Sequence, residues 1–288
     1  MSALLNAIND KYKTLSKGQK RIADYIMSQY DKAAFMTASA IGKTVDVSES
    51  TVVRFASELG FSGYPELQKT MQEMVKSRLT AIQRIEVADK RIGDETLVEQ
   101  VLSKDIELIR ETMAGVDKAA FDGSVKAINN ARKIYIIGVR SSAVLANFIA
   151  FYFNLVYDNV VLVDTSSASE IFETLFRIEE KDVCIAVTFP RYSMQIVQSL
   201  RFVAERKAKI IAITDSKNSH IASLADFVLI AKSDMVSFVD SLVAPLSLIN
   251  ALIVASTRTR RDEMLGNFAR LEEIWDTYEV YEKDEMNE

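Results

Sequence analysis

The chain of 288 residues contains one cysteine, Cys184, and one histidine, His220. A single cysteine excludes an internal disulfide and a metal site built from several cysteines, and a single histidine limits triad chemistry. Cys184 lies in the apolar run Asp-Val-Cys-Ile-Ala-Val, which favours a buried structural thiol over a nucleophile. We therefore predict no catalytic residue, no metal site and no cofactor.

Proline and glycine are also scarce, with 3 and 9 residues respectively. This scarcity excludes Pro-rich linkers and favours long helices. No apolar run reaches the roughly 18 residues that span a bilayer, because Asp240, Pro245 and Asn250 interrupt the best candidate, Val236–Ser256. The first residues also lack the apolar core of a secretory signal. We expect a soluble protein of a reducing compartment, the cytoplasm, with no membrane contact.

The net charge of −5 conceals an asymmetry along the chain. Residues 1–80 hold 11 Lys and Arg against 8 Asp and Glu, whereas the remainder holds 24 against 32. A cationic head on an acidic body is typical of a DNA-binding head, although many unrelated proteins share it.

The first segment, to about residue 76, has the pattern of several short helices. Ser16 and Gln19 form a capping-box signature ahead of apolar residues at helical spacing, which are Ile22, Ala23, Ile26 and Tyr30. Further helices are predicted over Thr37–Val45 and Ser48–Leu59, with Gly60 ending the latter.

The middle segment, Val75–Gly115, is rich in Lys, Glu, Leu and Ile and predicts two connecting helices with a break near Gly93. Its apolar positions suggest a buried stripe, with a partner subunit as one possible cover; they are Leu97, Val101, Ile106 and Ile109.

The third segment alternates short β-branched runs with helical patterns. Continuous apolar strands separated by helices predict a five-stranded parallel sheet flanked by helices on both faces, an α/β fold behind an α-helical head. The expected strands are Lys133–Gly138, Val160–Val163, Val183–Thr188, Lys209–Thr214 and Phe227–Ala231, with helices such as Ala143–Tyr157 and Ser193–Lys207 between them.

The string VSESTVVRFASELG predicts an amphipathic helix with a capped amino end. One face is apolar, through Val52, Phe55, Ala56 and Leu59. The other face carries small polar residues and an arginine, which suits the second helix of a helix-turn-helix lying in the major groove. A capped surface helix with a solvated polar face gives the same pattern.

The longer string IGKTVDVSESTVVRFASELGFSGYPEL, with IADYIM before it, resembles the amino-terminal domain of the RpiR family of bacterial regulators. The hallmark is Val-Ser-x-x-Thr-Val-x-Arg-Phe followed by Leu-Gly-Phe-x-Gly-Tyr. Gly42 departs from the family's usual Ala, and Asp46 from a frequent Gly in the turn. The resemblance implies a helix-turn-helix domain over residues 1–76 that contacts double-stranded operator DNA through Ser48, Glu49, Ser50, Thr51 and Arg54.

Three polar loops follow predicted strands, and ligands of parallel sheets bind at that edge. A strand, a tight loop and a helix amino terminus form a natural phosphate cradle. Together the loops resemble the sugar isomerase (SIS) domain, which follows the head in the RpiR family and here spans roughly Phe121–Ser256. The resemblance implies a phosphosugar site at Gly138, Arg140, Ser141, Ser142, Thr188, Arg191 and Ser193.

The loop sequences depart from the SIS pattern. Arg140 replaces the second glycine of the first loop, and Pro190 and Arg191 replace the central serine and glycine of the second. Arginine suits bidentate phosphate binding, so one interpretation is that ionic contacts replace lost ones. The other is that the arginines fill the pocket or pair with Asp164 or Glu170.

The resemblance as a whole implies a transcriptional regulator of sugar-metabolism genes. Its domains would be residues 1–76, a helical linker over 77–115 and a SIS domain with carboxyl-terminal helices over 116–288. It would bind operator DNA and a phosphorylated sugar as a homodimer or a dimer of dimers. The alternative is a phosphosugar isomerase with an appended DNA-binding domain, for which only His220 and Glu170 are candidate bases. The absence of Gly-x-Gly-x-x-Gly argues against a dinucleotide site.

Overall fold

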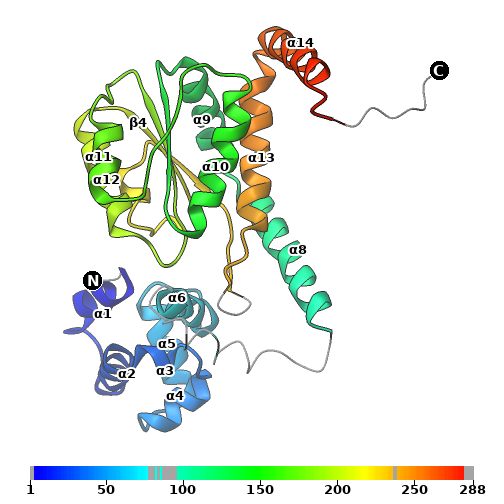
Figure 1. The fold of residues 1–288 in the computed structure, drawn as a ribbon. Helices are drawn as coiled ribbons and strands as arrows, with labels where there is room; N and C mark the ends of the chain where they lie inside the picture. Colours follow the sequence, from blue (N-terminus) through cyan, green and yellow to red (C-terminus); the bar gives the residue numbers. More distant parts are fainter. Residues whose placement is uncertain (1–2, 77–81, 83–84, 86–95, 236–238, 282–288) are drawn as a thin grey trace. The chain divides into compact units, whose positions relative to one another are not determined.

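The computed structural model describes residues 3–76, 82, 85, 96–235 and 239–281. The chain folds as two compact units, residues 1–90 and residues 91–288 (Figure 1).

The first unit consists of short helices. Their bounds are α1 Ala3–Lys11, α2 Lys17–Ser28, α3 Tyr30–Ala33, α4 Ala38–Thr44, α5 Glu49–Glu58 and α6 Tyr64–Lys76. The predicted capping box is confirmed, because Ser16 Oγ accepts the N–H of Gln19 and Gln19 Oε1 accepts the N–H of Ser16 at 3.0 Å. One detail was wrong. Tyr30 begins α3 rather than extending α2, since Gln29 leaves the helical conformation with φ −138° and ψ 39°.

The core of this unit is built from one apolar face of each longer helix. Ile22 and Ile26 of α2 and Val52 and Phe55 of α5 have no exposed surface. Tyr64, which starts α6, is also buried, and its hydroxyl donates to the carbonyl oxygen of Met36 at 2.5 Å. Burial raises the pKa of Tyr64 to about 12, so this hydroxyl stays protonated and keeps its hydrogen bond.

The second unit is built on a five-stranded parallel sheet, which confirms the predicted fold class. The strands are β1 Ile134–Gly138, β2 Val160–Leu162, β3 Val183–Val187, β4 Lys209–Thr214 and β5 Phe227–Ile230. Their order across the sheet is β2-β1-β3-β4-β5, and every neighbouring pair is parallel. Each strand begins and ends within one residue of its predicted bounds.

Helices cover both faces of the sheet (Figure 1). The side chains of each strand alternate between them: Ile134 and Ile136 join the core under one layer, and Tyr135 and Ile137 the core under the other. The first layer consists of α9 Lys118–Asn130, α10 Ser141–Asn154 and α13 Val243–Arg258, and the second of α11 Ala168–Leu175 and α12 Met194–Glu205.

Two further helices of this unit are α8 Leu97–Gly115 and α14 Arg261–Thr277. The buried stripe predicted for α8 is not buried within the chain, since Leu97 and Ile106 are 51% and 50% exposed. The buried side chains of α8 are Leu108 and Thr112, and Thr112 Oγ1 accepts the N–H of Lys232 at 2.8 Å. The other predicted connecting helix and the break near Gly93 lie outside the described residues.

Candidate functional site

Helix α5 presents the residues that we predicted to read DNA. Ser48 is its N-cap: Ser48 Oγ accepts the N–H of Thr51 at 3.3 Å and lies 2.9 Å from the Ser50 hydroxyl and 2.8 Å from the Thr51 hydroxyl. Hydrogen bonds of this kind hold the first turn of the helix in place and orient its free N–H groups.

The polar face of α5 is solvent-accessible. Ser48, Glu49, Ser50 and Arg54 are exposed and Thr51 is half-buried. The Arg54 guanidinium lies back along the helix, where it donates to the carbonyl oxygen of Ser50 at 3.2 Å and to the Ser50 hydroxyl at 3.3 Å. Ser50 and Arg54 thus form one polar surface close to the amino end of the helix.

Sequence reasoning missed Val53, an apolar residue that is 39% exposed on α5. It adjoins Arg54 and lies one turn beyond Ser50. An exposed β-branched side chain beside polar ones suits contact with a thymine methyl group. The signal in the sequence was that Val53 falls outside the i, i+3, i+4, i+7 series of the buried face.

The turn between α4 and α5 depends on the two positions where the head departs from the pattern of the family that it resembles. A Cβ added to Gly42 would lie 2.8 Å from the carbonyl oxygen of Val47, so the missing side chain allows the helices to approach closely. Asp46 adopts φ 53°, the left-handed conformation expected for it in place of glycine.

In the second unit, the first two predicted loops begin side by side. Gly138 at the end of β1 is in register with Val187 at the end of β3, and neighbouring strands lie about 4.8 Å apart. From β1 the chain continues through α10 to β2 on one side, and from β3 through α12 to β4 on the other. This reversal is the position at which open α/β sheets bind ligands.

The first loop has a tightly constrained backbone. A Cβ on Gly138 would lie 2.6 Å from the carbonyl oxygen of Ser142, so only glycine permits α10 to start this close to β1. Arg140 has φ 57° and ψ −128°, a region that side chains rarely adopt and that costs roughly 1–3 kcal/mol. Arg140 and Ser141 are exposed, and Ser142 is buried in the first turn of α10.

The second loop adds two hydroxyl groups. Thr188, directly after β3, is buried, and Ser193 is the half-buried N-cap of α12 but makes no side-chain capping hydrogen bond. Within the described part of the chain, the hydroxyls of Ser142, Thr188 and Ser193 have no hydrogen-bond partner. These hydroxyl oxygens are not among the buried atoms that lack a partner, so they are open to solvent and free to bind a polar ligand.

The arginines of the two loops can bind an anion, or they can fill the pocket or pair with Asp164 or Glu170. Arg140 and Arg191 are both exposed, and among the described residues neither forms an ion pair. Asp164 instead accepts the N–H and hydroxyl of Ser166 at 2.9 and 2.7 Å, and these bonds lower the pKa of its carboxyl. Glu170 lies in the first turn of α11, where its buried Oε2 atom has no hydrogen-bond partner.

The third loop, after β4, forms a hydrogen-bonded cluster. The Tyr192 hydroxyl, from the second loop, donates to Asp215 Oδ1 at 2.7 Å, and Thr214 Oγ1 lies 3.3 Å from the same atom. His220 is exposed, with its ring centroid 5.9 Å from that of Tyr192. Ser219, a polar residue of the same loop, is buried with an unpartnered hydroxyl.

Replacing Asp215 by asparagine should make stability less dependent on pH. Burial raises the pKa of the Asp215 carboxyl, and hydrogen bonds from Tyr192 and Thr214 oppose the rise. A raised folded-state pKa favours folding while the carboxyl is protonated, and this contribution is lost as pH rises through that pKa. The melting temperature of Asp215→Asn minus that of the wild type should therefore be larger at pH 7 than at pH 4.

The matched control is Asp158→Asn, at an exposed carboxylate. Its melting temperature relative to the wild type should change little between the two pH values. An equal difference at both pH values for Asp215→Asn would show that burial does not penalise ionisation of Asp215.

Among the described residues, no helix is both long and apolar enough to span a membrane, and no group of three or more His, Cys, Asp or Glu side chains is arranged to hold a metal ion. Cys184 is fully buried in β3, and burial raises the pKa of its thiol to about 12. A thiol with this pKa is inert near neutral pH, as expected for a structural cysteine.

Two sequence profiles match the chain. A helix-turn-helix domain of the rpiR family matches residues 2–78, and a SIS domain matches residues 127–255. Among curated proteins, an HTH-type transcriptional regulator of Clostridium perfringens is 25% identical and covers 79% of this chain and 80% of its own. The HTH-type transcriptional regulator HexR of Escherichia coli is 23% identical and covers 94% of this chain and 93% of its own.

Two solved structures are similar to this chain. The sugar isomerase domain of an RpiR transcription factor from Sphaerobacter thermophilus is similar with a TM-score of 0.59 and 26% identity, over 62% of this chain and 99% of that one. Vibrio vulnificus NanR in complex with ManNAc-6P has the same fold, with a TM-score of 0.59 and 18% identity over 96% of this chain and 98% of that one. With a helix-turn-helix head of the rpiR type joined to a SIS domain, this chain belongs to the RpiR family of transcriptional regulators.

Proposed function

We propose that this regulator controls sugar-metabolism genes by binding operator DNA through α5 and a phosphorylated sugar through the loops after β1 and β3. Ligand binding is supported by one observation above all. Among the described residues, the hydroxyls of Ser142, Thr188 and Ser193 have no partner, and they lie where the strand order reverses between β1 and β3. A phosphate has enough acceptor oxygens for all three hydroxyls and for N–H groups at the amino ends of α10 and α12.

The arginines strengthen this proposal. Arg140 and Arg191 bring positive charge to the two loops without an acidic partner among the described residues. Uncompensated cations beside helix amino ends are unfavourable unless an anion binds there. We therefore favour the interpretation in which Gly138, Arg140, Ser141 and Arg191 belong with the hydroxyls in one anion site. NanR, whose fold this chain shares, is in complex with ManNAc-6P, a compound of this class, in its solved structure.

For the head, we propose that Ser48, Glu49, Ser50, Thr51 and Arg54 contact DNA, with Val53 as an added apolar contact. The DNA-binding domain would span residues 1–76, a helical linker residues 77–115 and the ligand domain residues 116–288. The boundary between the two compact units, after residue 90, falls within that linker. We place the protein in the cytoplasm as a homodimer or a dimer of dimers, because a two-fold operator matches a two-fold protein.

The test measures DNA affinity with and without ligand. A duplex selected from a random library for binding to the purified protein serves as the operator. A panel of hexose, pentose and amino-sugar phosphates is then compared with the same sugars without phosphate. We expect one phosphorylated sugar to change the operator Kd at least about tenfold and to raise the melting temperature of the protein. A panel without any such effect would refute phosphosugar sensing.

The same panel tests the isomerase alternative. In the described part of the chain, the buried, unpartnered Oε2 atom of Glu170 is the feature that favours a base. We propose that the protein is not an enzyme, so the sugar phosphates should be recovered unchanged after incubation. Turnover that Glu170→Gln abolishes would overturn this part of the proposal.

The variants Ser142→Ala and Arg191→Ala should each lose the ligand response while keeping basal operator affinity. Ser142 is buried without a partner, so losing its hydroxyl should cost little stability but remove a phosphate contact. The matched control is Ser124→Ala, a buried serine of α9 whose hydroxyl donates to the carbonyl oxygen of Ala120. Operator Kd with and without the active ligand is the measurement, and an unchanged response in both site variants would place the pocket elsewhere.

A further inference from the structure

Helix α8 is the element through which the chain passes from the head to the sheet of the second unit. Its inner face carries Asp105, Leu108 and Thr112, which are spaced 3 and 4 residues apart. The Ser241 hydroxyl donates to Asp105 Oδ1 at 2.5 Å. The N–H of Lys232 donates to Thr112 Oγ1 at 2.8 Å. The segment that joins β5 to α13, the β5–α13 connection, therefore holds α8 at two points about 10 Å apart along the helix axis.

The described ends of the β5–α13 connection, residues 231–235 and 239–242, are joined by hydrogen bonds of their own. The Ser233 hydroxyl donates to the carbonyl oxygen of Ser241 at 2.9 Å. The N–H of Ser241 donates to the carbonyl oxygen of Asp234, also at 2.9 Å. Because both contacts with α8 come from these joined ends, a displacement of one end is passed to the other and to α8.

The β5–α13 connection starts beside the loops of the anion site. Strand β5 pairs with β4, and Asp215 directly follows β4. Burial raises the pKa of the Asp215 carboxyl, and the positive charge of Lys232 is among the influences that oppose the rise, so the two side chains interact. The Tyr192 hydroxyl donates to Asp215 Oδ1 at 2.7 Å. Tyr192 lies between Arg191 and Ser193 in the second loop, so the second loop is linked to Lys232 through Asp215.

We propose that the β5–α13 connection transmits anion binding from the loops after β1 and β3 to α8, and thereby to the point where the head is attached. This inference rests on the anion site proposed above. An anion bound there fixes the second loop and with it the contact between Tyr192 and Asp215. Lys232 interacts with Asp215 and binds Thr112 through its backbone, so an anion that favours one arrangement of the loops also favours one position of α8. Asp105 and Thr112 are positioning residues, since neither belongs to the loops of the anion site.

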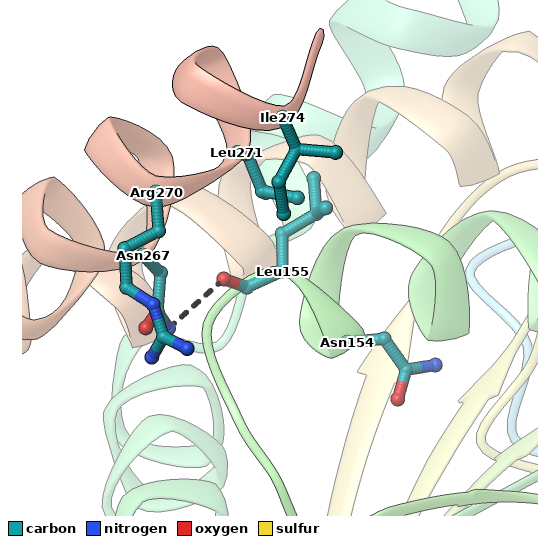
Figure 2. Close-up of a pocket in the computed structure, with 6 residues that line it drawn as sticks. All are labelled: Asn154, Leu155, Asn267, Arg270, Leu271 and Ile274. Atoms are coloured by element: carbon teal, nitrogen blue, oxygen red, sulfur yellow. Dashed lines mark hydrogen bonds between the residues drawn. The ribbon is translucent and has the colours of Figure 1, made fainter. Parts of the chain in front are cut away.

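A groove of about 320 Å³ between the end of α10 and α14 supplies the matched control (Figure 2). Helix α10 begins beside the anion site, with Ser142 in its first turn, and ends at its C-cap, Leu155, so the groove lies at the far end of that helix. Asn267 Nδ2 donates to the carbonyl oxygen of Leu155 at 3.3 Å. Asn267→Ala therefore removes a hydrogen bond between two elements without touching the β5–α13 connection.

The test is amide hydrogen exchange of the full chain, followed by mass spectrometry. Inorganic phosphate is the probe, and chloride at equal ionic strength is the reference. Phosphate should slow exchange in residues 188–197, which contain the second loop and the amino end of α12. In the wild type it should also slow exchange in residues 105–115 of α8 at least about threefold. The double variant Asp105→Ala, Thr112→Val should keep the response of the second loop, which also shows that this unit is folded, and lose the response of α8.

Tyr192→Phe provides a second variant that leaves α8 itself unchanged. It removes the hydroxyl that binds Asp215, so it too should keep the loop response and lose the α8 response. Asn267→Ala should show both responses, as the wild type does. A wild-type response in the second loop without one in α8 would overturn this inference and leave the anion site standing. No response in the second loop would overturn the anion site and the inference with it. An α8 response that persists in the double variant and in Tyr192→Phe would also overturn the inference.

Discussion

Arg54→Ala should weaken operator binding by about 10- to 100-fold while the head remains folded. Arg54 is exposed on α5, and among the described residues its hydrogen bonds stay within its own helix, to Ser50. On DNA the guanidinium can exchange these contacts for a phosphate or a guanine edge, and such a contact is worth roughly 1–3 kcal/mol. Alanine is the better helix former, so the stability of α5 should not fall. Fluorescence anisotropy with the selected operator, repeated at several salt concentrations, measures the loss.

The salt series distinguishes two roles for Arg54. A phosphate contact predicts that the slope of log K against log salt falls by about one unit, with similar loss on specific and non-specific DNA. A guanine contact predicts a loss confined to the specific site. Arg201→Ala, an exposed arginine of α12, is the matched control and should leave affinity unchanged. Normal operator binding by Arg54→Ala would mean that the polar face of α5 is not the DNA-reading face.

Gly138→Ala should destabilise the SIS unit by about 2 kcal/mol, and lower its melting temperature by roughly 4–8 °C. The added Cβ would lie 2.6 Å from the carbonyl oxygen of Ser142 and 3.0 Å from Ala146 Cβ. The first of these contacts is with backbone, so α10 must shift away from β1 rather than move a side chain. Because that shift would also displace Ser142, the ligand response should weaken together with stability.

The control for this experiment is Gly115→Ala at the end of α8, where an added Cβ has nothing within 4 Å. That variant should melt no lower than the wild type, since alanine favours helix over glycine. Differential scanning calorimetry can follow the two units as separate transitions, and only the SIS transition should move in Gly138→Ala. Equal melting of wild type and Gly138→Ala would mean that the contact between β1 and α10 is looser than the structure indicates.

Local patterns were sufficient to predict most of the elements. The Ser16 and Gln19 pair marked the start of α2, and Ser48 marked the start of α5, because capping involves atoms only three residues apart. The prediction for Tyr30 failed because it too used local spacing alone. The helical spacing of apolar residues continues past Gln29, but the backbone of Gln29 is not helical. The stripe on α8 shows a second limit, since periodicity identifies an apolar face without identifying what covers it.

The candidate site was only partly accessible to prediction. Apolar runs and polar loops placed Ser142, Thr188 and Ser193 near strand ends, and family resemblance singled them out as ligand residues. That their hydroxyls have no protein partner among the described residues follows from tertiary packing, as does the absence there of an ion pair between Arg140 or Arg191 and Asp164 or Glu170. Arg140 at φ 57° keeps a backbone conformation typical of the glycine that it replaces, which composition alone does not reveal.

The scarcity of cysteine, histidine and proline already determined that this protein is a helix-rich chain without disulfides, and the order of its apolar runs determined the parallel sheet. These properties depend on composition and on periodicity within a dozen residues. The tertiary structure alone decided that β1 lies between β2 and β3, that Tyr30 begins a separate helix, and that Leu97 and Ile106 of α8 remain exposed. Strand order, burial and hydrogen-bond partners depend on residues far apart in the chain, and a local pattern carries no information about them.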